Sequence, residues 1–148
     1  MILPVEIALI DDQDGLFQKQ LLRLLIAENI RKTGDVRVDR SIIRIQDTEN
    51  ETSSGGIWTE ILDDWMYIEI LYVPETLRGR GFGSILLKRA EEIAVSKGCV
   101  GIWLETFDFQ APGFYLTHGY SVFATLDNYP VGSNRRFLHK VFASCPNV

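Results

Sequence analysis

The sequence lacks the features that mark membrane, secreted and nucleic-acid-binding proteins. Among its 148 residues no apolar run approaches the roughly 18–20 residues that a helix needs to cross a bilayer. No basic segment followed by an apolar one opens the chain as a secretion signal. Lys and Arg number 15 against 20 Asp and Glu, a net charge of −5, whereas nucleic-acid-binding domains usually carry an excess of positive charge. We therefore expect no membrane partner and no nucleic-acid partner.

Cysteine is also scarce. Cys99 and Cys145 are the two in the chain, with no CxxC pair and no His-rich segment beside them, which argues against a metal site and a disulfide framework. Two reduced thiols in a cytoplasmic protein are the simpler interpretation. The chain shows no repeat, low-complexity tract or linker, so its length predicts one domain over residues 1–148.

Apolar periodicity predicts an alternation of strands and helices. Three strands joined by short turns should pair antiparallel, and the strand–helix–strand passage over residues 65–105 should be parallel and right-handed. The fold class is therefore α/β, a mixed central sheet of six or seven strands flanked by three or four helices. The expected strands cover residues 5–10, 40–46, 55–62, 65–73, 99–105, 120–126 and 137–142, and the expected helices cover residues 16–30, 81–97 and 112–118.

The most informative segment, residues 78–84, joins a strand to a helix and reads RGRGFGS. Its three glycines let the backbone turn tightly and approach a ligand, and the helix that follows presents unpaired N–H groups and a positive dipole end. Arg78 and Arg80 add positive charge, so the segment predicts a phosphate or pyrophosphate site. It has no Gly-Lys-Ser/Thr of a Walker A loop, and Ser84 stands where the dinucleotide fingerprint needs glycine. A nucleotide-binding domain that holds another pyrophosphate remains an alternative.

Two motifs resemble those of the GNAT N-acetyltransferases. Arg78-x-x-Gly81-x-Gly83 is similar to the family signature Q/R-x-x-G-x-G/A, and FYLTHGY, which contains Phe114 and Tyr115, is similar to F-Y-x-x-x-G-F/Y. The resemblance covers most of residues 58–141 and implies the GNAT fold, with acetyl-CoA as co-substrate in the gap between two parallel strands. The residues that it places against the coenzyme are Leu71, Tyr72, Val73, Arg78, Gly79, Arg80, Gly81, Phe82, Gly83, Ser84, Gln110 and Phe114.

The same resemblance assigns catalytic roles. It implies that the Tyr115 hydroxyl protonates the departing thiolate, against the alternative of a packed aromatic ring, and that the Leu71 N–H polarises the thioester carbonyl. Glu69 is the candidate general base by its strand face rather than by its position, because the family's catalytic glutamate aligns with Tyr67. By the period of two it shares a strand face with Tyr67, Leu71 and Val73, and its pKa should rise if it is desolvated. A salt bridge, a contact with the substrate ammonium, or a bound water in its place remain open.

These residues predict an enzyme that transfers an acetyl group from acetyl-CoA to a primary amine, of a small molecule or a peptide, by direct attack in a ternary complex and with no metal. The alternative is a catalytically silent module that binds or senses acyl-CoA. The protein should act as a monomer or homodimer. The residues expected to shape the acceptor pocket are Asp108 and the aromatic residues Phe107, Phe109 and Tyr129. The acidic residues that favour a cationic acceptor are Asp63, Asp64, Glu69, Asp108 and Asp127.

Overall fold

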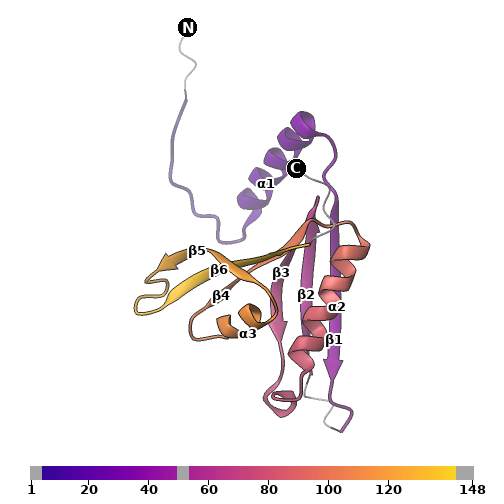
Figure 1. Ribbon diagram of the computed structural model, residues 1–148. Coiled ribbons are helices and arrows are strands. Elements are labelled where there is room, and N and C mark those ends of the chain that lie inside the picture. Colours follow the sequence, from indigo (N-terminus) through magenta and orange to yellow (C-terminus); the bar gives the residue numbers. More distant parts are fainter. Residues whose placement is uncertain (1–4, 50–53, 143–148) are drawn as a thin grey trace. The chain divides into compact units, whose positions relative to one another are not determined.

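The computed structural model describes residues 5–49 and 54–142 and separates into two compact units, residues 1–36 and 37–148 (Figure 1). The first unit holds helix α1 (Leu16–Thr33), which begins after Gly15 and ends at Gly34 as the sequence predicts. The strand expected over residues 5–10 is wrong. The segment forms no strand, because a strand requires a neighbour with which its N–H and C=O groups pair. Cys145 lies outside the described residues.

The second unit is built on a six-stranded mixed sheet with the order β1-β2-β3-β4-β6-β5. Strands β1, β2 and β3 pair antiparallel, β3 and β4 pair parallel, and β6 pairs antiparallel with both β4 and β5. The predicted α/β class and both kinds of pairing are therefore confirmed. The strands are β1 (Val38–Gln46), β2 (Ser54–Leu62), β3 (Trp65–Tyr72), β4 (Gly101–Phe107), β5 (Ser121–Asp127) and β6 (Asn134–Val141).

Helix α2 (Phe82–Ser96) lies along one face of this sheet and contacts β2, β3 and β4 (Figure 1). Its buried side chains are Leu86, Leu87, Ala90 and Ala94. Apolar character alone does not decide burial along this helix, since Ile85 is 53% exposed whereas Leu87 is fully buried. The core continues into the sheet through Ile57, Ile61, Met66, Ile68, Ile102, Leu104 and Leu138.

Two short helical segments complete the second unit: the 3-10 helix η1 (Glu75–Leu77) and helix α3 (Pro112–Thr117). Proline starts α3 and Gly119, with φ of +85°, follows its end, which is the asymmetry that a helix favours. Cys99 is buried in the core, as expected of a structural thiol. No helix among the described residues is long and apolar enough to cross a membrane.

The parallel strands β3 and β4 separate partway along their length. Their pairing extends from Trp65 beside Gly101 to Ile68 beside Leu104 and stops there. Beyond this point β3 pairs, among the strands that the structure describes, with β2 alone, so these strands do not use the N–H and C=O groups of its other edge. The separation opens a gap at the carboxyl ends of two parallel strands, where ligands of α/β sheets bind.

Candidate active site

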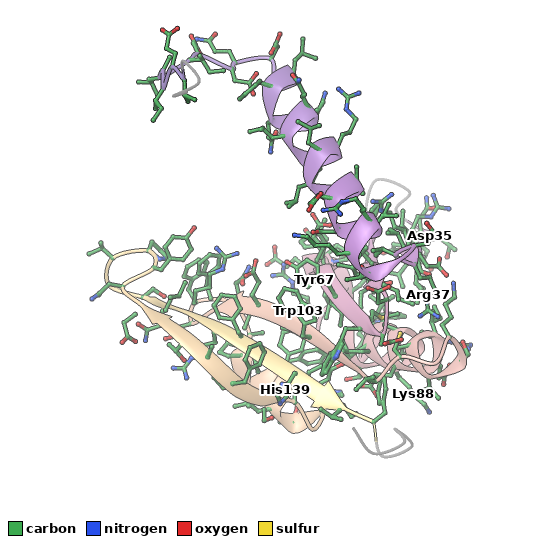
Figure 2. The ribbon with its side chains drawn as sticks, turned by 90° about the horizontal axis from the view of Figure 1, so that it is seen from above. Asp35, Arg37, Tyr67, Lys88, Trp103 and His139 are labelled. Carbon is green, nitrogen blue, oxygen red and sulfur yellow. The ribbon has the colours of Figure 1, made fainter. Side chains whose placement is uncertain are left out.

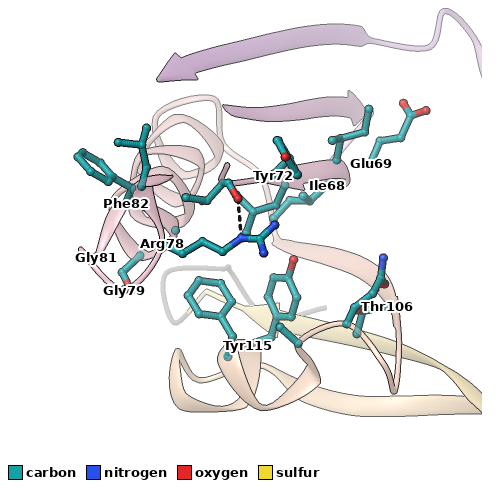
Figure 3. A pocket seen from close by; sticks show the side chains of 18 of the residues that line it. Ile68, Glu69, Tyr72, Arg78, Gly79, Gly81, Phe82, Thr106 and Tyr115 are labelled. Carbon is teal, nitrogen blue, oxygen red and sulfur yellow. Dashed lines mark hydrogen bonds between the residues drawn. The ribbon is translucent and has the colours of Figure 1, made fainter. Parts of the chain in front are cut away.

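A cavity of about 960 Å³ lies where β3 and β4 separate (Figure 3), and this volume falls within the range of about 300–1,000 Å³ typical of small-ligand sites. Its walls come from the end of β3, the glycine loop, the start of α2, the end of β4 and the start of α3. Both predicted catalytic residues, Tyr115 and Glu69, line it. Among the predicted coenzyme contacts, those that line it are Leu71, Tyr72, Val73, Arg78, Gly79, Gly81, Phe82, Gly83, Ser84, Gln110 and Phe114.

The glycine loop leaves the first turn of α2 open toward the cavity. Gly79 and Gly81 have φ of +71° and +83°, a region that favours glycine, and no side chain caps the helix N-terminus at Gly81. The Arg78 Nε donates a hydrogen bond to the Val73 carbonyl at 2.9 Å, which anchors the guanidinium to the end of β3. Arg80, the second arginine of the motif, does not line the cavity, and its guanidinium lies 5.3 Å from the Phe82 ring centroid.

Helices α2 and α3 are joined across the cavity wall by a short polar chain. The Ser84 hydroxyl donates to His118 Nε2 at 2.9 Å, and His118 Nδ1 donates to the Phe114 carbonyl at 2.7 Å. Gly83 faces the Phe114 ring, and a Cβ at this position would come within 3.4 Å of it. The two GNAT-like motifs, which are 30 residues apart in sequence, therefore meet on the same side of the cavity.

Tyr115 is a buried residue whose side chain reaches the cavity. It is 8% exposed, and its hydroxyl points into the space between α3 and β3 (Figure 3). Burial raises the pKa of Tyr115 from 10 to about 12. The phenol therefore holds its proton throughout the neutral range and can donate it.

Glu69 occupies a β-bulge in β3. Trp58 of β2 pairs with Ile70 and the next residue, Thr59, pairs with Ile68, so Glu69 has no residue opposite it. A bulge shifts the alternation of side chains by one position. As a result Leu71 and Val73 pack against the core that contains Ile68, whereas Glu69 is exposed.

Two expectations for Glu69 change with the bulge. The predicted shared face with Leu71 and Val73 is wrong, because the period of two does not continue through an inserted residue. The expected desolvation of its carboxylate is also not found, because Glu69 is exposed. Glu69 still lines the cavity, and its carboxylate has no hydrogen-bond or ion-pair partner among the described residues.

Gln110 stabilises the connection between β4 and α3 through the oxygen of its side-chain amide. Its Oε1 accepts hydrogen bonds from the Thr106 hydroxyl at 2.9 Å and from the Phe107 N–H at 2.8 Å. These bonds fix the side-chain orientation, and the Nε2 amide group, which has no partner among residues 5–49 and 54–142, is the end that can donate to a ligand. Gln110 lines the cavity, as does Thr106.

The residues expected to shape the acceptor pocket divide into two groups. Phe109 lines the cavity and stacks on Phe107, with ring centroids 5.0 Å apart, and Tyr129 lies 6.0 Å from Phe107. Asp108 is instead structural, because it accepts hydrogen bonds from Arg136 and Asn134 of β6, and the Arg136 guanidinium holds the pKa of Asp108 below its usual value.

Of the five acidic residues expected to attract a cationic acceptor, Glu69 is the one that lines the cavity. Asp63 and Asp64 form the β2–β3 turn, and Asp127 ends β5. Glu105 does line the cavity and was not among the predicted site residues. The sequence did contain a signal for it, because Glu105 closes an apolar strand predicted to lie parallel to the strand of Glu69. No three His, Cys, Asp or Glu side chains gather as a metal site within the described part of the chain.

Comparison with known proteins identifies the family. The sequence model of the acetyltransferase (GNAT) family matches residues 14–120. An acetyltransferase of Agrobacterium fabrum is 30% identical over 132 residues, which are 89% of this chain and 96% of the relative. Blasticidin-S acetyltransferase of Streptomyces morookaense is 41% identical over 88 residues, which are 59% of this chain and 65%, just under two thirds, of that protein's length.

Solved structures agree with the sequence relatives. The crystal structure of an acetyltransferase from Bacillus cereus superposes with a TM-score of 0.77 at 27% identity, and the match covers 93% of this chain and 98% of that one. An aminoglycoside 6'-N-acetyltransferase complexed with coenzyme A shares the fold, with a TM-score of 0.61 at 17% identity over 86% and 90% of the chains. With the family match over most of its length, a relative at 30% identity and the GNAT fold, this chain belongs to the GNAT family of acetyltransferases.

Proposed function

We propose that this protein transfers the acetyl group of acetyl-CoA to a primary amine by direct attack in a ternary complex. The amine nitrogen forms a bond to the thioester carbonyl carbon, the carbon–sulfur bond breaks, the amine loses a proton, and the sulfur gains one. The observation that carries the proposal is that one cavity brings together an uncapped helix N-terminus, an unpaired strand edge and a buried protonated tyrosine.

The coenzyme end of the cavity is the glycine loop. The free N–H groups of the first turn of α2 and the positive end of its dipole favour the pyrophosphate, and Arg78, anchored on the Val73 carbonyl, adds a positive charge beside them. Leu71, Tyr72 and Val73 offer backbone groups to the amide-rich pantetheine arm in the manner of an added strand. The Gln110 amide group is a further donor. Arg80 contributes from outside the cavity lining, by long-range attraction only.

The chemistry takes place between β3 and α3. The Leu71 N–H polarises the carbonyl, and an oriented donor of this kind is worth about 3–4 kcal/mol in acyl transfer. Tyr115 gives its proton to the sulfur as the thiolate leaves. Glu69, exposed and unpaired at the bulge, accepts the proton from the amine directly or through a water molecule. Because Glu69 is open to solvent, the amine must be delivered close to its carboxylate.

The resemblance to a blasticidin-S acetyltransferase supports a small-molecule acceptor over a peptide. We further propose that the chain works as one domain in the cytoplasm, as a monomer or homodimer. The second candidate function, a silent module that binds or senses acyl-CoA, is favoured by one observation: the proposed base is exposed rather than desolvated. A module of that kind would bind acetyl-CoA and release no thiol with any amine.

The first test is ligand binding. Isothermal titration calorimetry with acetyl-CoA, ATP and NAD should show binding of acetyl-CoA alone. Arg78→Gln should weaken it about 10–100-fold, the value of a charged hydrogen bond. Arg89→Gln is the matched control, since Arg89 lies on the exposed face of α2, away from the cavity, and pairs with Glu92 at 3.2 Å. Binding of ATP or NAD without acetyl-CoA would reject the coenzyme assignment.

The second test is turnover. Thiol release from acetyl-CoA is measured against a panel of small cationic amines, aminoglycoside-like compounds and basic peptides. We expect amine-dependent release that exceeds hydrolysis, with formation of the acetylated amine checked by mass spectrometry. Acetyl-CoA binding with no release for any amine would favour the silent module instead.

A further inference from the structure

A second carboxylate lies at the point where the two parallel strands separate. Ile68 and Leu104 are the last paired residues of β3 and β4, so Glu69 and Glu105 occupy corresponding positions on the diverging strands. Both line the cavity, and the third charged residue of the lining is Arg78 near the glycine loop. The cavity therefore has a cationic end, suited to the coenzyme, and an anionic end at the strand separation.

Glu105 is held by one of its two oxygens. The Tyr67 hydroxyl donates to Oε1 at 3.3 Å, and Arg135 Nη2 of β6 pairs with the same oxygen. Oε2 has no partner among the residues that the structure describes. The side chains of Glu105 and Arg135 are each 23% exposed. The carboxylate is thus oriented by two donors while its second oxygen remains available to a ligand.

The two groups that hold Glu105 are themselves fixed by aromatic rings. Tyr67 stacks on Trp103 with centroids 4.3 Å apart, and Figure 2 shows both rings side by side on neighbouring strands. The Arg135 guanidinium lies 5.2 Å from the Phe107 ring and 5.1 Å from the Tyr129 ring. Forming a surface ion pair usually costs side-chain entropy. Here the aromatic rings already restrict Tyr67 and Arg135, the two residues that hold Glu105, so this cost is reduced.

The pKa of Tyr67 indicates that Glu69 and Glu105 lie close enough to act on the same hydroxyl. Burial is the main cause that raises the pKa of Tyr67, and the negative charges of Glu105 and Glu69 raise it further, while Arg135 lowers it. Both carboxylates therefore act on one hydroxyl. Since Arg135 neutralises Glu105, the cluster keeps one net negative charge from Glu69, which a monocation would balance.

We propose that Glu105 binds the ammonium group of the acceptor through Oε2, with Tyr67 and Arg135 as positioning residues. The inference rests on the proposed acetyl transfer and narrows its acceptor to an amine that binds in its cationic form. Glu105 holds the ammonium beside Glu69, which takes one proton to give the neutral amine and passes that proton to solvent. The second proton leaves the nitrogen after it has attacked the carbonyl carbon, and it balances the proton that the sulfur gains. This division explains how an exposed carboxylate can act on the amine, because the amine is delivered to it by its neighbour.

The test compares a cationic with a neutral nucleophile. The full-length Glu105→Gln variant is assayed with the most active cationic amine of the thiol-release panel and with hydroxylamine, which is uncharged at neutral pH. We expect KM for the cationic amine to rise about 10–100-fold, the value of a hydrogen bond to a charged group, and KM for hydroxylamine and the acetyl-CoA Kd to change less than about threefold.

Glu60→Gln is the matched control. Glu60 is also a strand glutamate in an ion pair, with Arg40 at 2.7 Å and a side chain 34% exposed, but it does not line the cavity. Its removal should leave both nucleophiles unaffected. Equal losses for the two nucleophiles in Glu105→Gln, or no loss for either, would overturn the proposal.

If Glu105→Gln does not fold, judged by its melting temperature, Tyr67→Phe replaces it. This variant keeps the ring stack on Trp103 and removes one donor to Oε1, so KM for the cationic amine alone should rise about threefold to tenfold. An unchanged KM for the cationic amine would show that Tyr67 does not position Glu105, and the proposal that Glu105 is an oriented binding group would be rejected. Acetyl-CoA binding without thiol release for any amine would instead reject the proposed function, and this inference with it.

Discussion

Removing the Tyr115 hydroxyl is the most direct test of the proposed chemistry. The phenol is 8% exposed, lines the cavity, and has a pKa of about 12. No described residue makes a hydrogen bond to its hydroxyl, so Tyr115→Phe leaves no orphaned partner in the protein. The free energy of unfolding at neutral pH should therefore change by less than about 1 kcal/mol.

The expected loss of rate is moderate. General acid catalysis is worth about 10²–10⁴-fold, but a thiol with a pKa of about 8–9 leaves readily without help. We therefore expect the acetyl-transfer rate constant to fall about 10–100-fold, which corresponds to about 1.4–2.7 kcal/mol of transition-state stabilisation. The acetyl-CoA Kd should change less than about threefold, because the proton is needed as the carbon–sulfur bond breaks.

The assay is single-turnover acetyl transfer with excess enzyme, since steady-state kcat would hide the effect if product release were slow. Tyr120→Phe is the control. Tyr120 is 3% exposed, packs edge-on against Tyr115 with centroids 5.9 Å apart, and does not line the cavity. A wild-type transfer rate in Tyr115→Phe, or an equal loss of rate in Tyr120→Phe, would refute the role of the Tyr115 hydroxyl as general acid.

Two further predictions concern stability. Gly81→Ala should lower the free energy of unfolding by about 1–2 kcal/mol, because φ is +83° there although a Cβ meets nothing within 4 Å. In Gly83→Ala, where φ is ordinary and the Cβ would touch the Phe114 ring at 3.4 Å, stability should change by less than about 1 kcal/mol. Urea denaturation compares the pair, and an equal loss in both would contradict the strain argument. The raised pKa of Tyr115 favours its neutral form in the folded state, so its contribution to stability is complete below pH 10 and is lost as pH rises from about 10 to about 12. Between neutral pH and pH 11, the free energy of unfolding should therefore fall by about 1.4 kcal/mol less in Tyr115→Phe than in the wild-type protein. Thermal unfolding over this pH range measures the difference, and an equal pH dependence of the melting temperature in the two proteins would rule it out.

Most of the local structure can be predicted from short stretches of the amino-acid sequence. The period of the apolar residues predicts α2 and its partner strands, and the proline and glycine around α3 mark its ends. The glycine loop and Tyr115 were found in the same way, because each belongs to a short contiguous motif. Such features depend on backbone preferences and hydrogen bonds within a few residues, which the sequence alone encodes.

What the sequence did not determine depends on register between distant segments. The bulge at Glu69 is invisible in the apolar pattern of β3, yet it exposes the carboxylate and moves Leu71 to the core side. The same limit explains why Arg78 reaches the cavity and Arg80 does not, since the fold of the loop decides which arginine faces β3.

Glu105 is the clearest case of a site residue whose role depends on contacts between distant segments. Its partners Tyr67 and Arg135 are about 30–40 residues away along the chain, on strands that meet it only in the folded sheet. Strand order, the point at which β3 and β4 separate, and the burial of each charge follow from packing of the whole sheet. The sequence therefore specifies which chemical groups are present, and the packing of the folded sheet determines which of them share one cavity.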